Sequence, residues 1–197
     1  MHDRIMQIFH QSIETKMQAG ELLTPLIDKA SQMIVSSLLN EGKVLVAGNG
    51  CSAAIGQVMV ASLINRLKQE RPSLPAINIA GDSATLTAIA NDFSYNDVFA
   101  KQVRALGNAG DVLLMITSTG NSSNLVQAIA AAHDRHVAII AMTGSDGGDL
   151  ATLLDADDLE LRVPSDSPVH VHEVHLLTVF CLCDLIDFQL FGAQDPL

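Results

Sequence analysis

The chain has 197 residues, which suits one domain or one domain with an added helical arm. Hydrophobic residues make up 48% of it, enough to bury a large core, but no apolar run reaches the roughly 18 residues of a membrane-spanning helix. The net charge of −11, with only 11 scattered Lys and Arg residues, argues against direct binding to nucleic acid, which needs a basic face.

The N-terminal residues and the cysteines predict a cytoplasmic protein. The first 16 residues lack the basic-then-apolar pattern of a secretory signal. Three cysteines, an odd and sparse number, fit a reducing compartment without a disulfide framework.

Residues 1–41 are predicted to form a helical arm, because their apolar residues recur at helical spacing. Pro25 is suited to the first turn of a helix, so we expect two helices, at about 3–20 and 24–40. The sequence Asn40-Glu41-Gly42 is a reasonable end for the second.

Residues 42–165 are predicted to form an α/β core in which short apolar strands alternate with helices. The expected strands are 43–47, 76–80, 111–117, 136–142 and 158–163, and the expected helices are 52–67, 83–91, 95–105, 121–133 and 146–154. This alternation predicts a five-stranded parallel sheet with right-handed crossovers. Ligands of such sheets bind at the carboxyl ends of the strands.

Residues 166–197 are predicted to form a long final helix, about 168–191, followed by a short tail. From Val174 to Phe191 this helix is apolar on nearly all sides, which is typical of a helix that is buried all round. Since one small domain cannot easily cover it, we expect other copies of the chain to do so, in a homo-oligomer with a helical-bundle core. The whole of residues 1–197 is treated as one domain.

Two polar loops, each between a predicted strand and a predicted helix, indicate a phosphate-binding site. The start of a helix offers free backbone N–H groups and a positive dipole end, and hydroxyl groups add neutral donors. Either loop alone is explained by ordinary turn and N-cap residues. Two such loops in one parallel sheet favour a ligand site, and its candidate residues are Asn49, Gly50, Ser52, Thr117, Ser118, Thr119 and Ser122.

Other motifs narrow the ligand class. After Gly48-Asn49-Gly50 no third glycine completes G-x-G-x-x-G, and no G-x-x-x-x-G-K-[ST] loop occurs, which argues against nicotinamide cofactors and P-loop nucleotide hydrolysis. The segment from Thr143 to Gly148 is interpreted as a tight turn with a helix cap. Asp92 either lies at the rim of the pocket, where it would accept bonds from sugar hydroxyls, or caps a helix.

A histidine cluster at the start of the final helix leaves two interpretations open. His172 and His175 share a helix face as an i, i+3 pair, and with Glu173 they are candidates for catalysis or for zinc binding. The spacing H-E-x-H differs from the zincin motif H-E-x-x-H. We favour a solvated or subunit-contact helix start, and expect no cofactor.

Several stretches resemble the sugar isomerase (SIS) domain family over nearly the whole chain. They are Gly48-Asn49-Gly50-x-Ser52, Glu70-Arg71-Pro72-x-x-Pro75-Ala76, Ala90-Asn91-Asp92, Gly110-Asp111-Val112-Leu113-Leu114, Thr119-Gly120-Asn121-Ser122 and Thr143-Gly144-x-Asp146-Gly147-Gly148. The chain is similar to the branch that holds phosphoheptose isomerases and DnaA initiator-associating proteins. The resemblance implies a flavodoxin-like SIS fold, a homotetramer, and a phosphosugar held by the two loops.

The resemblance also implies that the isomerase residues are lost. The isomerases carry a His and a Glu on the helix after the first loop, where this chain has Val58 and Ser62. They carry a Gln and a His on the last helix, where it has His172 and Phe180, and an Asp just ahead of that Gln matches Val169. Isomerisation needs a base and an acid partner, which these replacements do not supply.

The last helix is similar to that of the DnaA initiator-associating proteins, which implies DnaA as a partner. The similar stretches are Cys181-Leu182-Cys183-Asp184-Leu185-Ile186-Asp187 and the pair Leu190-Phe191. That pair either docks DnaA through an exposed aromatic anchor or closes the helical bundle. We expect a phosphosugar-binding tetramer of this type. The alternative is a phosphoheptose isomerase, for which the family implies zinc, that converts sedoheptulose 7-phosphate to a heptose 7-phosphate for lipopolysaccharide synthesis.

Overall fold

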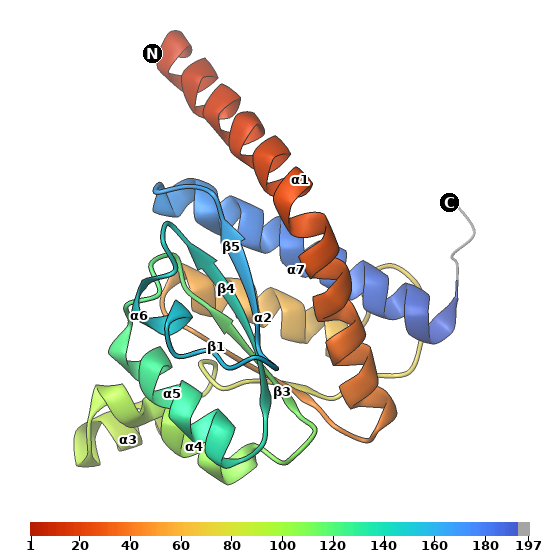
Figure 1. The fold of residues 1–197 in the computed structure, drawn as a ribbon, viewed down its shortest axis with the longest axis vertical. Helices are drawn as coiled ribbons and strands as arrows, with labels where there is room; N and C mark the ends of the chain where they lie inside the picture. The colour runs from red at the N-terminus through yellow and green to blue at the C-terminus, as the bar shows by residue number, and fades with distance from the viewer. Residues whose placement is uncertain (193–197) are drawn as a thin grey trace.

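The computed structural model describes residues 1–192 and places helices on both faces of a five-stranded parallel sheet (Figure 1). The strands are β1 (Val44–Gly48), β2 (Ala76–Asn78), β3 (Val112–Ile116), β4 (Ala138–Gly144) and β5 (Leu159–Val163). The helices are α1 (His2–Leu39), α2 (Cys51–Ile64), α3 (Ser83–Asp92), the 3-10 helix η1 (Tyr95–Asp97), α4 (Val98–Leu106), α5 (Ser123–Asp134), α6 (Gly148–Ala151) and α7 (Pro168–Phe191). The predicted α/β class and parallel sheet are confirmed.

The strand order is β2-β1-β3-β4-β5, and all pairs are parallel. The strand that follows β1 in the sequence, β2, lies on one side of β1, and the next strand, β3, lies on the other side. The direction in which successive strands are added therefore reverses between β1 and β3. Every residue of these two strands is buried, as expected where helices cover both faces. A reversal of this kind creates a crevice at the carboxyl ends of the two strands.

Alternate residues of the strands enter two separate hydrophobic cores, because successive side chains point to opposite faces. Val46 and Leu114 pack on one face with α1, α2 and α7. Leu45 and Met115 pack on the other face with α4 and α5. Figure 1 shows α4 and α5 on one side of the strands and α7 on the other.

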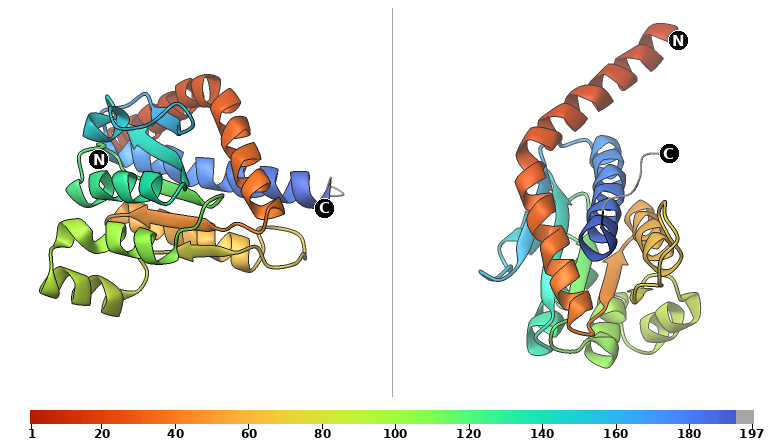
Figure 2. Two further views of the ribbon diagram at one scale, coloured as in Figure 1. Left: turned by 60° about the horizontal axis from the view of Figure 1, so that its bottom comes forward. Right: turned by 90° about the vertical axis from the view of Figure 1, so that its right-hand side faces the viewer.

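The arm is one helix of 38 residues, so the prediction of two helices is wrong. Pro25 lies inside it and lacks the N–H that would bond to the carbonyl four residues earlier. The Thr24 hydroxyl donates to the Gly20 carbonyl at 2.6 Å, one residue before the Glu21 carbonyl that the proline leaves without its usual partner. The helix changes direction partway along (Figure 2), as a proline kink would produce. Its predicted end is confirmed, since Asn40 is the C-cap.

Two elements are shorter than predicted because local turns end them. The strand β2 stops at Asn78, whose side-chain oxygen accepts from the Ala80 N–H at 3.0 Å and whose carbonyl accepts from the Gly81 N–H. The helix α6 is a single turn that begins after Gly147, a residue with φ of 84°. A left-handed residue at that point prevents an earlier start.

The final helix α7 is covered on one side only within a single chain. Val179, Leu182 and Ile186 are fully buried, whereas Phe180 and Phe188 remain 40% and 56% exposed. By length and composition alone this helix could cross a membrane, contrary to the expectation from the sequence. In the fold it packs against α1 and α2 as a core helix.

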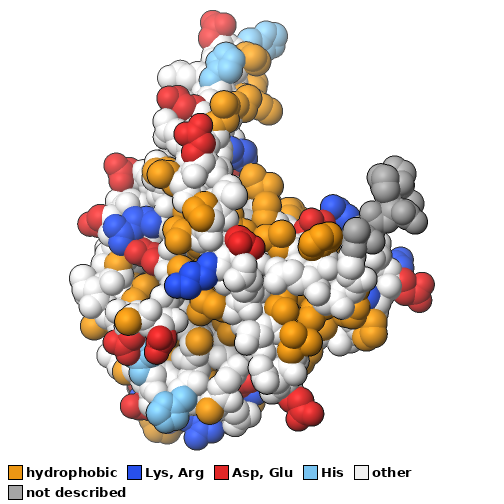
Figure 3. Space-filling model, turned by 45° about the vertical axis from the view of Figure 1, so that its right-hand side comes forward, with side chains coloured by type: hydrophobic (Ala, Val, Ile, Leu, Met, Phe, Trp, Pro, Cys, Tyr) orange, Lys and Arg blue, Asp and Glu red, His pale blue; other side chains and the backbone are white. Residues whose placement is uncertain are grey.

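The projecting half of α1 also exposes apolar side chains. Ile5, Phe9, Ile13 and Met17 are each more than half exposed, and hydrophobic side chains gather on this arm in the space-filling view (Figure 3). Both long helices therefore offer apolar surface that a single chain leaves open to solvent.

A buried ion pair fastens the segment before β2 to α7. The Arg71 Nε atom donates to Asp187 Oδ1 at 2.8 Å, and the two side chains are 1% and 0% exposed. Three of the four other guanidinium hydrogens bond to the carbonyls of Ser62, Leu63 and Pro72. Because removal of one partner leaves a buried unpaired charge, this contact is costly to break.

We predict that Asp187→Ala lowers the free energy of unfolding by about 3–5 kcal/mol, since it leaves the Arg71 guanidinium buried without its counter-ion. Chemical denaturation at one fixed protein concentration measures the loss. Asp184→Ala is the matched control on the same helix, because its partner Lys68 is 59% exposed and the pair should contribute little. Equal effects of the two substitutions would contradict the assignment.

Candidate functional site

The two predicted loops lie next to each other at the carboxyl edge of the sheet. In the β1–β3 pairing, Gly48 is the partner of Ile116, so the first loop begins directly beside the second. A Cβ atom at Gly48 would lie 2.9 Å from the backbone of Ser52, which shows how closely α2 passes over the end of β1. Gly50 has φ of 53° and forms the N-cap of α2. Both glycines therefore follow from the tight strand-to-helix turn.

A reciprocal pair of side-chain amides joins the two loops. Asn49 Nδ2 donates to Asn124 Oδ1, and Asn124 Nδ2 donates back to Asn49 Oδ1, both at 2.9 Å. Asn124 is 2% exposed and lies in the first turn of α5. The pair fixes the distance between the loops, because each amide satisfies the other.

The second loop curls around the buried Thr117 hydroxyl. Its Oγ1 accepts from the Gly120 N–H at 3.1 Å and from the Thr119 N–H at 3.4 Å. Thr119 is exposed, Ser118 and Ser122 are half-buried, and Ser122 is the N-cap of α5. Hydroxyl groups and the open start of a helix thus surround one concave turn, an arrangement suited to an anion.

The loop after β4 supports the second loop. Leu150 donates its N–H to the Gly120 carbonyl at 3.0 Å, and Asp149 donates to Asn121 Oδ1 at 2.9 Å. Gly120 has φ of 71°, and a Cβ there would collide with the Gly147 carbonyl oxygen. The predicted turn is shorter than the segment from Thr143 to Gly148, because Thr143 and Gly144 end β4 and only residues 145–147 form the turn that leads into α6. This turn and the start of α6 buttress the candidate site.

His172 is the histidine that the fold brings to the loops. Its Nε2 lies 3.5 Å from Ser52 Oγ, and partial burial lowers its pKa. His175 is 1% exposed, with Nε2 3.0 Å from the Thr143 carbonyl oxygen, and burial lowers its pKa to about 4. Of the favoured prediction, a solvated or subunit-contact helix start, the solvated alternative is therefore wrong for His175, which is buried within its own chain. The two rings are 6.5 Å apart between centroids.

Glu173 turns away from His172 and His175 toward the arm. It accepts from the Ser12 hydroxyl at 2.5 Å and from Lys16 Nζ at 3.3 Å, and the Ser12 bond is the main cause of its lowered pKa. Within residues 1–192, no three His, Cys, Asp or Glu side chains converge as metal ligands. His172 and His175 without a third donor do not fit a zinc site in this chain.

The positions at which the resemblance predicts catalytic residues hold no acid–base pair. Val58 packs against the core, and Ser62 is buried with its hydroxyl donating to the Val58 carbonyl at 2.9 Å. Phe180 lies on the exposed side of α7. Neither Val58 nor Phe180 has a group that transfers a proton.

The remaining predicted residues are Asp92, Leu190 and Phe191. Asp92 is exposed at the end of α3, and its recorded side-chain bond is from its neighbour Asn91, so its role as a rim residue stays a prediction. Leu190 is half-buried against the core and Phe191 is 40% exposed, at the end of α7. Apart from Gly192, the polar tail predicted after them lies outside the described residues.

Two residues of the site, Tyr95 and Asn124, were missed from the sequence. Tyr95 Oη donates to Asn49 Oδ1 at 3.0 Å and so joins the amide pair. The position of Asn124 at the end of the polar run after β3 is consistent with a site residue. The same position is equally consistent with an ordinary polar residue in the first turn of a helix. Tyr95 is 46 positions from Asn49, and no local pattern connects them.

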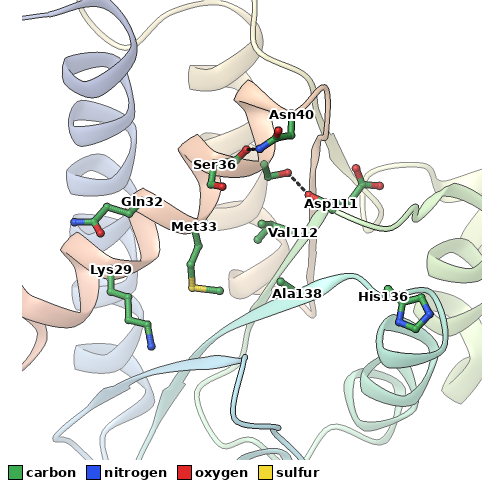
Figure 4. Close-up of a pocket in the computed structure, with 11 residues that line it drawn as sticks. Lys29, Gln32, Met33, Ser36, Asn40, Asp111, Val112, His136 and Ala138 are labelled. Carbon is green, nitrogen blue, oxygen red and sulfur yellow. Dashed lines mark hydrogen bonds between the residues drawn. The ribbon is translucent and has the colours of Figure 1, made fainter.

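A pocket of about 610 Å³ lies at the opposite, amino edge of the sheet (Figure 4). Met33 from α1, Asp111 and Val112 near the start of β3, and Ala138 on β4 are among its lining residues. The Asp111 carboxylate already accepts from the Lys43 ammonium and from two backbone N–H groups. This pocket therefore has a structural ion pair in its wall, and it lies away from the edge where parallel sheets bind ligands.

Comparison with known proteins agrees with this geometry. The SIS domain family matches residues 8–144. The phosphoheptose isomerase of Chromohalobacter salexigens is 56% identical over 192 residues, 98% of each chain. The DnaA initiator-associating protein DiaA of Yersinia enterocolitica is 54% identical over 195 residues, 99% of this chain and all of the other.

A solved structure gives the same result for the fold. The phosphoheptose isomerase of Francisella tularensis superposes with a TM-score of 0.92 at 48% identity, covering 94% of this chain and 97% of that one. The shared fold and the loops at its switch point lead to one conclusion: the chain belongs to the SIS domain family.

Proposed function

We propose that the chain binds a phosphorylated sugar between its first loop, residues 48–52, and its second loop, residues 117–122. The observation that carries the proposal is the reciprocal bond between Asn49 and Asn124, which holds two helix-start loops side by side at the switch point. Backbone N–H groups and the hydroxyls of Thr119 and Ser122 supply donors for the phosphate. Asn49 and Ser52 face the same crevice and suit the sugar.

We further propose that the protein is of the DiaA type and has lost the isomerase reaction. Relatives named phosphoheptose isomerase and DiaA match at 56% and 54% identity, so overall likeness does not separate them. Residue chemistry favours the second, because Val58, Ser62 and Phe180 stand where the isomerases carry proton-transfer and metal-binding groups. Glu173, the nearest carboxylate to His172 in sequence, is bonded to the arm.

The assembly follows from the same relatives and from the two half-covered helices. We propose a cytoplasmic homotetramer in which partner copies cover the apolar sides of α1 and α7, with residues 1–197 acting as one domain. DnaA would dock at the end of α7, where Phe191 is accessible in a single chain. An exposed aromatic at a helix end is a suitable anchor for a protein partner.

Phosphoheptose isomerase is the second candidate function, and one observation favours it. His172 Nε2 lies 3.5 Å from Ser52 Oγ in the first loop, so one titratable group does reach the crevice. In that case zinc or a residue of a partner copy would have to complete the site.

We predict that Ser122→Ala weakens the binding of sedoheptulose 7-phosphate roughly three- to tenfold, because the variant lacks one hydroxyl donor to the phosphate. Isothermal titration calorimetry measures the change. Ser145→Ala is the control, since this serine follows the neighbouring strand β4 and bonds instead to Asp166 at 2.7 Å. Equal affinities of the Ser122 variant and the unmodified protein would contradict the proposed phosphate site.

We predict that immobilised protein captures purified DnaA and that replacing both Leu190 and Phe191 by alanine reduces capture at least about tenfold, as loss of an interface anchor does. Phe188→Ala, an exposed aromatic one turn earlier, should leave capture unchanged. Size-exclusion chromatography checks that each variant keeps its oligomeric state. Absence of capture by the unmodified protein would overturn the DnaA assignment.

The isomerase candidate makes the opposite prediction about catalysis. If it is correct, purified protein converts sedoheptulose 7-phosphate to a heptose 7-phosphate, and His172→Ala abolishes turnover. His170→Ala is the matched control, because its Nδ1 faces Glu173 at 3.5 Å and not the loops. We expect no turnover from the unmodified protein.

A further inference from the structure

Tyr95 connects a peripheral part of the fold to the centre of the candidate site. It begins η1, just after α3, and its hydroxyl donates to Asn49 Oδ1 at 3.0 Å. Its ring is 57% exposed, and α3 before it has no buried residue. The segment formed by α3 and η1 is joined to the core by the helix that follows it, α4, whose Val98 and Phe99 are buried. The Tyr95 side chain is therefore not needed to build the core, and its one recorded polar contact is with Asn49.

The bond from Tyr95 fills an acceptor site on the Asn49 side chain. An asparagine side chain has two acceptor sites on Oδ1 and two hydrogens on Nδ2. On Asn49, both acceptor sites are filled, one by Tyr95 and one by Asn124, and one of the two hydrogens goes to Asn124. The structure records no protein partner for the second hydrogen among residues 1–192. Because the amide is planar, this hydrogen lies at the edge away from Tyr95.

We propose that Tyr95 is a positioning residue of the phosphosugar site, an inference that rests on the proposed function. Its hydroxyl holds the Asn49 amide in the orientation that offers an N–H group to the ligand. If both amides of the pair rotated by half a turn, their mutual bonds would survive. Asn49 would then present a carbonyl oxygen to the crevice, which cannot donate to the ligand and repels the acceptor-only oxygens of a phosphate.

Tyr95 selects between these two orientations because a phenol is a better donor than acceptor. In the observed orientation it donates to a carbonyl oxygen, its favoured role. In the rotated orientation it would have to accept from Nδ2. The reciprocal pair alone cannot make this selection, since it is the same for either orientation. Tyr95 thus supplies the asymmetry that makes Asn49 a donor, and it acts on the ligand only through Asn49.

The test is a double-mutant cycle on sedoheptulose 7-phosphate binding, measured by calorimetry on the full-length protein. Tyr95→Phe removes only the hydroxyl and should weaken binding about three- to tenfold, with thermal stability unchanged. In an Asn49→Ala background the same change should alter affinity less than about twofold. Asn96→Ala, the exposed neighbour in η1, is the control and should bind like the unmodified protein.

The outcomes separate this inference from the proposed function. If the unmodified protein does not bind the phosphosugar, the proposed site fails and the role of Tyr95 fails with it. If it binds and Tyr95→Phe binds equally well, only the role of Tyr95 is overturned. The role of Tyr95 would also be overturned if Tyr95→Phe reduced the affinity equally in the unmodified protein and in the Asn49→Ala variant. Tyr95 would then affect binding by a route other than the Asn49 amide.

Discussion

The reciprocal bond between Asn49 and Asn124 is the contact on which the candidate site depends. It joins the loop after β1 to the first turn of α5, across the point where the strand order reverses. A parallel sheet brings two helix starts together there, but it does not fix the distance between their loops. The amide pair does so without any charge, and leaves the hydroxyls of the second loop for an anionic ligand.

Much of the fold could be predicted from the sequence, because the apolar periodicity of the strands is a local property. The single helix α1 could not, because Pro25 locally favours a helix start and the packing of α1 on α7 and the sheet overrides that preference. The adjacency of the two loops was predictable from glycine and hydroxyl residues that directly follow strands of one parallel sheet. Tyr95 was not, since its bond to Asn49 joins segments that no sequence pattern relates.

The histidine segment shows how tertiary contacts decide chemistry. His172, Glu173 and His175 are close in sequence, and a helix start could offer all three to one ligand. In the fold, Glu173 instead bonds to Ser12 of the arm, which lies 161 positions earlier in the sequence. His175 is buried against the Thr143 carbonyl. Only His172 stays beside the crevice. These contacts support the proposal of a binding site in which apolar and structural residues stand where a proton-transfer pair would be needed.

Solvent exchange into bound sedoheptulose 7-phosphate tests this account most directly, because isomerisation must begin with removal of a proton from a carbon next to the carbonyl. The protein is incubated with the sugar phosphate in deuterium oxide. Nuclear magnetic resonance then follows two properties of the ligand, the width of its signals and the deuterium content at carbon 1. The account predicts broadened ligand signals, which report binding, and no deuterium at carbon 1. Binding together with deuterium at carbon 1 would show that a base still reaches the sugar, and would contradict it.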